Sequence, residues 1–438
     1  MHANEANLAR LKYVFQNMDD AVLATKMNGE LVYANPSAGR LFGLPGMTGT
    51  KLWKTIPLIE ENDDLIQLFI DSIMNKRKNI SSLVDYVNAD GTRYKLHVSL
   101  TCDAEESGIF LIVISDLTEL IKVHSAFQRY TSPEIADYVL TAPGGEKQGG
   151  TDREVTILMS DLRGFTALSS RIPCDDLITM LNHYFECMSA VIDGCRGTII
   201  EFLGDGLFVV FGAPKDQPDH AEAAVTCAIR MQNGMAAVNE WNRSRGYPDL
   251  EMGIAIHSGM AVVGNIGSDK RMKYGCMGET VNLAGRLETY SIGGQVLVSE
   301  HTAALLPEKP EAAGENTFMP KGGTKEIVYY DVTGLGEERL AAAAEAEWVP
   351  AGDRECPFYE LDGKTVSAEA RSGKLTRITA DERWGILVPE GELAPLQNLM
   401  LRLAGKDVYA KVVSKDGDGY RICFTSKPDS LFTLLEIK

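Results

Sequence analysis

Two acidic side chains lie four residues apart in the otherwise largely apolar stretch IEFLGDGLFVVFG, residues 200–212. The Gly-Asp-Gly at its centre is typical of a tight turn between two strands. Glu201 therefore lies on the first strand of a predicted hairpin, and Asp205 lies at its turn. Carboxylates on such a hairpin are costly to bury unless they are paired, hydrogen-bonded or bound to a metal ion. The spacing leaves open whether the two acids serve one purpose or two.

A third acid, Asp161, ends the strand predicted from REVTILMSDL and precedes a glycine turn. If that strand neighbours the hairpin in one sheet, Asp161 and Asp205 converge on one point. Two carboxylates held close together either share a proton or hold cations. Hard oxygen ligands suit magnesium or manganese, and a two-metal site suits displacement at phosphorus. The turn offers backbone amides to a phosphate around Gly164, with Phe165 and Thr166 next in the chain.

The stretch GETVNLAGR carries a further group of candidate residues. Asn282 and Arg286 are four residues apart and share one face of a predicted helix. The Asn amide suits a ribose hydroxyl, and the Arg guanidinium offers a fork of donors to a phosphate. Alone, the pair is also typical of a solvated helix face, just as an Asp-Gly turn is usually only a turn. The functional prediction therefore depends on how all these motifs combine.

The elements around these residues predict one α+β domain. Residues 174–194 have apolar side chains at helical spacing, and Gly194 is typical of a helix end. A second helix is predicted from DHAEAAVTCAIRMQ, alternating strands from EMGIAIHSGMAVVGNIG, and a third helix from ETVNLAGRLETY. Hairpins joined by crossover helices favour a sandwich in which the helices pack on one sheet.

The composition restricts the class of protein. The chain has 438 residues, of which 45% are hydrophobic and 24% charged, and its formal net charge is −18. These values are typical of a globular protein of two or three domains, and the negative charge disfavours a nucleic-acid or anionic-membrane partner. The N-terminus lacks a signal-peptide pattern, and the apolar run at 109–114 is too short for membrane insertion. The 8 cysteines form no CxxC pair, which is typical of reduced thiols in a cytoplasmic protein.

Composition changes and turn signals divide the chain into three predicted domains with two connecting segments. Ser132 and Pro133 are typical of a helix start, so a helical connector is expected. This connector is either a two-fold contact that transmits a signal or a spacer. The predicted boundaries are 8–120 for an N-terminal domain, 121–150 for the connector, 151–333 for a central domain, 334–352 for a linker and 353–438 for a β-rich domain.

The N-terminal domain resembles a PAS sensor domain. The resemblance rests on the stretch GELVYANPSA and on the closing VISDLTEL, which belong to an expected antiparallel sheet. It implies that an unidentified small ligand or signal acts on this domain. No cysteine lies in the flavin-adduct motif of light-sensing relatives, and His97 in an alternating strand is typical of an ordinary strand residue. No ligand is therefore assigned.

The central domain resembles the catalytic domain of class III nucleotidyl cyclases. Five motifs occur in the family's order: SDLRGFT, FLGDGLFVVFG, HSGMAVVGNIGSDKRMKY, GETVNLAGRLE and PKGGTKEIVYYDV. The resemblance covers almost all of residues 151–333 and implies a ferredoxin-like α/β sandwich. It also implies an activity, the conversion of a nucleoside triphosphate into a cyclic 3′,5′-monophosphate and pyrophosphate.

The resemblance further implies a metal site. The family's two metal-binding aspartates fall on Asp161 and Asp205, and Leu162 is assigned to the same site. Two Mg²⁺ or Mn²⁺ ions per site would activate the ribose 3′-hydroxyl for in-line attack and hold the triphosphate with its leaving group.

Substrate-binding residues and an oligomer follow from the same resemblance. Asn282 would orient the ribose, Arg286 would stabilise the charge that develops on the α-phosphate, and Lys321 would bind the triphosphate. In the family one domain supplies the metal aspartates and a second supplies the other groups, so a two-fold homodimer is expected. Because these positions all carry the family's residue types, we expect an active enzyme, with a non-catalytic nucleotide-binding module as the alternative.

Two further positions would select the purine. Four residues before the second metal aspartate, adenylate cyclases carry lysine and guanylate cyclases carry glutamate, and this chain has Glu201. A carboxylate accepts hydrogen bonds from N1–H and the 2-amino group of guanine but repels N1 of adenine. The second position, Gly275, matches neither pattern but leaves room for the O6 side of guanine, and Cys276 is adjacent. GTP is the predicted substrate and ATP the alternative, and a pairing of Glu201 with a surface lysine would leave the choice open.

The C-terminal region is predicted to form a small β-barrel. Its strand order loosely resembles a PilZ barrel, but ITADERWG departs from that family's turn and the paired arginines are missing. We therefore expect a docking or regulatory module that does not read a cyclic dinucleotide.

Overall fold

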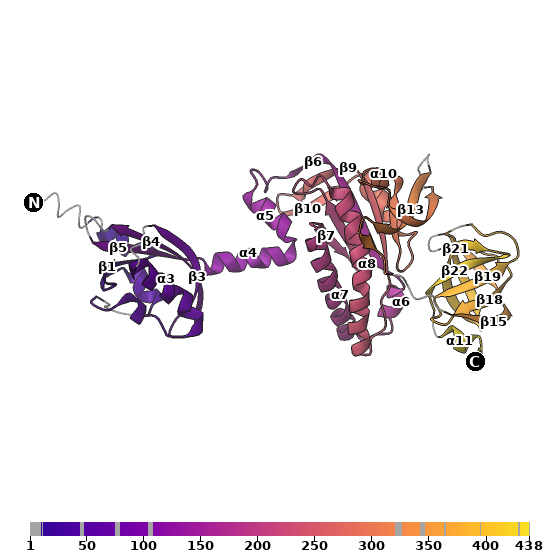
Figure 1. Cartoon of the computed structure of the whole chain (residues 1–438), viewed down its shortest axis with the longest axis horizontal. Coiled ribbons are helices and arrows are strands. Elements are labelled where there is room, and N and C mark those ends of the chain that lie inside the picture. Colours follow the sequence, from indigo (N-terminus) through magenta and orange to yellow (C-terminus); the bar gives the residue numbers. More distant parts are fainter. Residues whose placement is uncertain are drawn as a thin grey trace, which may run out of the picture. The chain divides into compact units, whose positions relative to one another are not determined.

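The computed structural model describes residues 10, 12–43, 48–74, 79–103, 108–319, 326–341, 347–362, 365–394, 396–427 and 430–437. The chain forms two compact units, Met1–Tyr130 and Thr131–Lys438, and Figure 1 colours their elements along the sequence. Within the described ranges, no helix has both the length and the apolar character that crossing a membrane requires.

The first unit contains a five-stranded antiparallel sheet with strand order β2-β1-β5-β4-β3, which confirms the sheet expected for the sensor domain. The side chain of Asn35 accepts hydrogen bonds from the backbone amides of Val22 and Ala38, and so joins the first strand to the start of α2. Helix α4 has no buried residue. The strands are β1 Ala21–Lys26, β2 Leu31–Ala34, β3 Ile80–Val87, β4 Arg93–Asp103 and β5 Ile109–Asp116; the helices are α2 Pro36–Leu41, η1 Leu52–Lys54, η2 Glu60–Asn62, α3 Asp63–Met74 and α4 Thr118–Tyr130.

The second unit contains a nine-stranded sheet that runs β12-β13-β11-β9-β6-β8-β7, with β10 paired to β9 and β14 to β13. Successive residues of a strand point to opposite faces of a sheet. Leu158 on β6 accordingly packs with α7 and α8, whereas Ile157 packs with α5 and α9. The strands are β6 Gly149–Leu162, β7 Thr198–Leu203, β8 Gly206–Phe211, β9 Met252–Ser268, β10 Arg271–Met277, β11 Val296–Ser299, β12 Glu311–Phe318, β13 Ile327–Leu335 and β14 Glu338–Arg339.

The helices of this sandwich agree with the sequence pattern where it was strong. Helix α7 ends at Gly194, as predicted, and lies beside α8 in Figure 1. Helix α5 begins at Pro133 after the N-cap Ser132 and packs Ile135 against the nine-stranded sheet, so part of the predicted connector belongs to this sandwich. The helices are α5 Pro133–Thr141, α6 Phe165–Ser169, α7 Cys174–Gly194, α8 His220–Ser244, α9 Glu279–Glu288 and α10 Glu300–Ala304.

The C-terminal region forms an open eight-stranded antiparallel sheet, here called the C-terminal sheet, and the predicted barrel is wrong. Its order is β15-β18-β19-β22-β21-β20-β16-β17, and no pairing among the described residues joins the end strands β15 and β17. Strand β17 pairs with β16 at only two positions, and an isolated bridge between Phe358 and Arg371, not a ladder, joins β16 to the segment before β18 among the described residues. The elements are β15 Trp348–Glu355, β16 Phe358–Asp362, β17 Thr365–Val366, β18 Gly373–Thr379, β19 Trp384–Pro389, β20 Asn398–Leu403, β21 Lys406–Asp416, β22 Gly419–Ser426 and α11 Leu431–Leu434.

Candidate active site

The sheet brings Asp161 and Asp205 together. Strand β6 pairs with β8, and Asp205 lies in the two-residue turn between β7 and β8, just beyond the paired residues Ser160 and Leu207. Gly206 permits this approach, because a Cβ at that position would lie 2.6 Å from the carbonyl oxygen of Ser160 and 3.5 Å from Asp161 Oδ1. The turn of the hairpin therefore meets the end of β6, as the sequence predicts.

The two carboxyl groups form a half-buried pair. The two side chains are close enough for each to influence the pKa of the other. Burial raises the pKa of both groups, and the charge of Asp161 raises the pKa of Asp205 further. The backbone amide of Leu162 and the charge of Arg163 partly oppose this rise at Asp205. Such a pair is stabilised by a shared proton or by cations.

This donor set fits a divalent cation of the magnesium type. Magnesium is usually bound by one or two carboxylates, and substrate phosphates and water complete its coordination. Asp161 and Asp205 supply the carboxylates, while the side chain of Leu162 is buried, so its carbonyl is the candidate ligand. Among the described residues, no group of three or more Asp, Glu, His or Cys side chains is placed to hold a metal ion.

Arg163 is a residue of this site that the sequence analysis missed. Its Nη2 lies 3.3 Å from Asp161 Oδ2 and also contacts the carboxylate of Glu288, the last residue of α9. The side chains of Arg163 and Glu288 are 16% and 15% exposed, so solvent screens this pair little. The position of Arg163 two residues after Asp161 was the available signal, but its partner lies 125 residues away.

The predicted phosphate turn, residues 161–166 and here called the Asp161 turn, connects β6 to α6. Gly164 has φ of 69°, a conformation that glycine adopts readily, and it is the N-cap of α6. Phe165 is half-buried against the core, and Thr166 is exposed. Lys321, the predicted triphosphate ligand, lies outside the described residues.

The nucleotide-binding candidates lie on exposed surface. Asn282 and Arg286 are both exposed on α9. Within the described part of the chain, no hydrogen bond or ion pair joins either side chain to Asp161 or Asp205. One chain therefore brings the aspartates together but leaves the α9 pair apart from them.

The two predicted base-selecting residues lie on β7 and β10, two strands that do not pair with each other among the described residues. Glu201 is 46% exposed and forms an ion pair with Lys273 at 2.6 Å, which is the surface pairing that leaves the base open. Gly275 lies opposite Gly264 of β9. The adjacent Cys276 is buried, and burial raises the pKa of its thiol to about 11, so its side chain belongs to the core.

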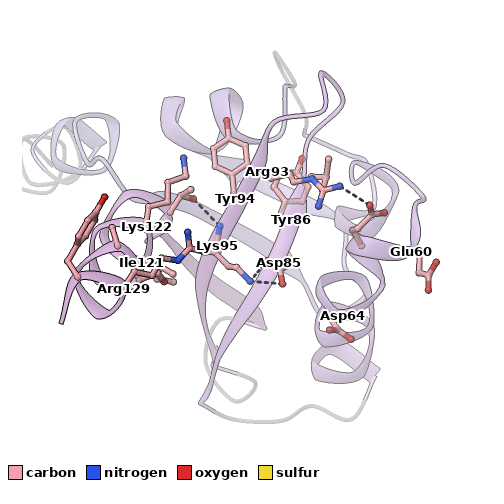
Figure 2. A pocket seen from close by; sticks show the side chains of 16 residues that line it. Glu60, Asp64, Asp85, Tyr86, Arg93, Tyr94, Lys95, Ile121, Lys122 and Arg129 are labelled. Carbon is pink, nitrogen blue, oxygen red and sulfur yellow. Dashed lines mark hydrogen bonds and ion pairs between the residues drawn. The ribbon is translucent and has the colours of Figure 1, made fainter. Parts of the chain in front are cut away.

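A pocket of about 1030 Å³ lies in the first unit. Figure 2 shows ion pairs at its wall between Lys95 and Asp85 and between Arg93 and a glutamate, Glu61. Tyr86 is fully buried there, and its hydroxyl has no hydrogen-bond partner among the described residues. The pocket shows that the sensor domain has space for a ligand, with mixed charge at its wall.

The fold and the paired aspartates define the class of protein, and comparison with protein families agrees. Residues 148–334 match the family model for the adenylate and guanylate cyclase catalytic domain, and residues 9–74 match a PAS domain model. The chain contains a class III nucleotidyl cyclase catalytic domain preceded by a PAS domain.

Curated relatives carry both substrate names. Adenylate cyclase 1 of Rhizobium meliloti is 35% identical over 185 residues, which are 42% of this chain and 28% of that protein. Receptor-type guanylate cyclase gcy-28 of Caenorhabditis elegans is 31% identical over 210 residues, which are 47% of this chain and 16% of that protein. The chain thus spans less than a third of either relative, and their names leave the nucleotide open.

Solved structures similar to this chain include cyclases of both kinds. The guanylyl cyclase Cya2 is 45% identical, with a TM-score of 0.43, and the match covers 44% of this chain and 100% of that one. The adenylyl cyclase CyaB from P. aeruginosa is 34% identical, with a TM-score of 0.42, and the match covers 44% of this chain and 99% of that one.

Proposed function

We propose that the protein is a guanylate cyclase that converts GTP into cyclic GMP and pyrophosphate under the control of its PAS domain. The observation that carries the cyclase reaction is the half-buried pair of Asp161 and Asp205 beside the turn at the start of α6, where backbone amides have no partner within the helix. Such a pair suits in-line displacement at phosphorus. The preference for GTP rests on Glu201, four residues before Asp205.

In the proposed reaction the ribose 3′-oxygen forms a bond to the α-phosphorus, and the bond from that phosphorus to the pyrophosphate oxygen breaks. Asp161, Asp205 and the carbonyl of Leu162 would hold two Mg²⁺ or Mn²⁺ ions. These ions, when bound, supply the Lewis acidity that makes the 3′-hydroxyl a better nucleophile. The amides of Gly164, Phe165 and Thr166 would hold the triphosphate by donating to its oxygens.

The remaining groups would come from a second copy of the chain. Asn282 would orient the ribose, and Arg286 would stabilise the charge that builds on the α-phosphate; Lys321 would bind the triphosphate. A partner is supported by exposed apolar side chains of the catalytic domain, since patches of this kind commonly mark protein interfaces. They are Phe202, Leu203, Met260, Val262, Met272 and Met277, each between 41% and 58% exposed. Two of them, Val262 and Met277, are directly paired across β9 and β10.

Guanine is proposed as the base because the Glu201 carboxylate can accept from two adjacent donors of guanine. The ion pair with Lys273 is half-exposed, so it is expected to be weak and to yield to a better partner. ATP remains the second candidate, because Gly275 offers no side chain to read either base and one of the curated relatives is named an adenylate cyclase. The PAS domain and the helices after it would act by changing how the two catalytic domains close.

The test uses the purified full chain with Mn²⁺ and either GTP or ATP, and the products are identified by chromatography. We expect cyclic GMP to form faster than cyclic AMP. Faster formation of cyclic AMP would contradict the base assignment and leave the cyclase assignment standing. No product from either nucleotide, with Asp205→Asn indistinguishable from wild type, would favour a non-catalytic nucleotide-binding module.

A further inference from the structure

A buried lysine of the C-terminal sheet reaches the catalytic domain. Lys411 on β21 is 3% exposed, and its Nζ donates to the carbonyl oxygen of Thr289 at 2.7 Å. The same Nζ lies 5.7 Å from the centroid of the Tyr290 ring. Burial, and after it the charge of Arg163, lower the pKa of Lys411 to about 7. Lysine is almost never fully buried without such partners, so this contact is specific.

The Thr289 contact lies next to the ion pair that reaches the Asp161 turn. Thr289 follows Glu288, and the Glu288 carboxylate contacts the guanidinium of Arg163. Lys411 thus holds the end of α9 at the residue next to the partner of Arg163. Because Arg163 also lies 3.3 Å from Asp161, the C-terminal sheet is two contacts away from a candidate metal ligand.

A second cation of the C-terminal sheet approaches the same turn from another side. Arg383 donates to the carbonyl oxygen of Gly293, and its Nε lies 3.6 Å from Glu251 Oε1. The backbone carbonyl of Glu251 accepts from the backbone N–H of Arg163 at 2.7 Å. Glu251 therefore contacts the C-terminal sheet through its side chain and the Asp161 turn through its backbone.

The end of β22 lies directly against the Asp161 turn. A Cβ at Gly164 would lie 2.9 Å from the carbonyl oxygen of Thr425. Arg171, which follows α6, has its guanidinium nitrogens 3.4 Å from the carbonyl oxygen of Lys427. Backbone of the C-terminal sheet therefore limits the movement of the segment whose amides would hold the triphosphate.

We propose that the C-terminal sheet is a positioning element of the cyclase site. Lys411 and Arg383 fix residues 289–294 and Glu251. These residues in turn hold Arg163 and the Asp161 turn in place. The inference rests on the proposed function. The C-terminal sheet is proposed to support the site and not to block it. With these contacts in place, Asp161 is 40% exposed and Asn282 is exposed. The Asp161 side chain is therefore still partly open to a ligand.

Hydrogen exchange of the full-length protein tests the contact without any turnover. Lys411→Met is compared with Lys415→Met, a matched control at an exposed position of the same strand. We expect exchange of peptides that cover residues 287–296 and 161–166 to accelerate by about tenfold in Lys411→Met and to stay unchanged in the control. Unchanged exchange in both peptides, with β20 to β22 still protected, would overturn the proposal.

The consequence for the site is measured as the affinity for Mn²⁺ in the absence of nucleotide. The electron paramagnetic resonance signal of free Mn²⁺ monitors the binding. A looser turn, or an Arg163 released toward Asp161, would weaken Mn²⁺ binding, and we expect about a threefold loss in Lys411→Met. Arg383→Met should act in the same direction and serves if Lys411→Met does not fold. Tighter Mn²⁺ binding or faster turnover in either variant would show that the C-terminal sheet inhibits the site instead of supporting it. That result would overturn the proposal. If wild type binds Mn²⁺ but converts neither GTP nor ATP, the proposed function fails while the exchange experiment still decides the contact.

Discussion

The two halves of the candidate site differ within one chain. In the candidate metal half, Asp161 and Asp205 are half-buried and close together, and Arg163 lies 3.3 Å from Asp161. In the nucleotide half, Asn282 and Arg286 lie on open surface, and no described contact links them to the aspartates. The fold of one chain therefore brings the two aspartates together, whereas it leaves Asn282 and Arg286 exposed on its surface.

This difference suggests how control could be exerted. Electrostatic catalysis depends on groups that are already oriented when charge develops. A site whose metal half is rigid and whose nucleotide half arrives from a partner can be switched by small changes in how two domains close. The surface of α9 and β10, rather than the aspartates, is then the place where a sensor domain would act.

The largest expected effect comes from the metal half. Asp205→Asn removes a charge from the cation site, and we expect kcat to fall at least about 100-fold, which is about 3 kcal/mol in the activation barrier. Asp152→Asn is the control, because Asp152 is exposed at the start of the same strand, β6, that ends at Asp161. Steady-state rates with Mn²⁺ and GTP measure the effect. A rate close to that of wild type for Asp205→Asn would remove the metal assignment.

The comparison between the two halves predicts complementation. Asp205→Asn destroys the metal half and Arg286→Ala the nucleotide half, so each homodimer should be inactive. A mixed dimer has one site in which both halves are intact, and random mixing should restore about a quarter of the wild-type activity. Co-expression with two affinity tags isolates the mixed dimer. If that dimer forms and stays inactive, the site is not shared between two chains as proposed.

The prediction that Asp161 and Asp205 lie close together is confirmed, and for a physical reason. The strand ending at Asp161 and the hairpin turn at Asp205 are local patterns of burial and turn chemistry, and neighbouring strands then bring them together. The pair of Arg163 with Glu288 spans 125 residues and depends on where α9 ends, so no local pattern indicates it.

The C-terminal region also shows that local sequence patterns do not predict contacts between distant segments. Strands and turns of β15 to β22 are readable from alternation and Gly or Asp-Gly signals, but closure of a barrel depends on whether the first and last strands meet. Here an isolated bridge between Phe358 and Arg371, instead of a continuous ladder, links β16 to the segment before β18, and the sheet is open. The burial of Lys411 was equally hidden, because its cationic side chain on an alternating strand is typical of a solvent-exposed position.

The next effect concerns base selection in the nucleotide half. Glu201→Lys with Gly275→Asp replaces a carboxylate that accepts from guanine by a cation that donates to N1 of adenine. We expect the ratio of kcat/KM for GTP over ATP to fall by about 100-fold, which is the scale of one unmatched polar group. Glu222→Lys, an exposed position on α8, controls for the change of charge. An unchanged ratio would contradict the account of base reading.

Smaller effects are expected from the buried network behind the metal half. His257 Nδ1 lies 2.8 Å from Ser299 Oγ, and the network continues through Thr302 and Ser258 to Thr156 on β6. Burial, and after it the charge of His301, lower the pKa of His257 from 6.5 to about 4. Between these values the unfolded chain binds more protons than the folded protein, so the free energy of unfolding falls as the pH drops.

His257→Gln should remove this dependence. Between pH 7 and pH 5, wild type should lose about 2 kcal/mol of unfolding free energy more than the variant does. Calorimetry of the catalytic-domain transition at several pH values measures the difference. His301→Gln, an exposed neighbour on α10, removes only the secondary cause and should keep most of the slope. Equal slopes in wild type and His257→Gln would mean that another group titrates.

The smallest expected effect concerns the ion pair of Glu201 with Lys273, which lies on the surface of the nucleotide half. Both side chains are about half exposed, so the pair is worth at most about 1 kcal/mol. If Glu201 reads guanine, Lys273 competes with the base, and Lys273→Met should lower KM for GTP about twofold to threefold with kcat unchanged. Lys270→Met, at the exposed tip of the β9–β10 hairpin, is the matched control. A higher KM for GTP in Lys273→Met would mean instead that Lys273 holds the Glu201 carboxylate in the orientation that guanine needs. Salt tests whether the ion pair is the cause in either case, because screening should reproduce the effect of Lys273→Met in wild type only if that effect comes from the loss of the ion pair.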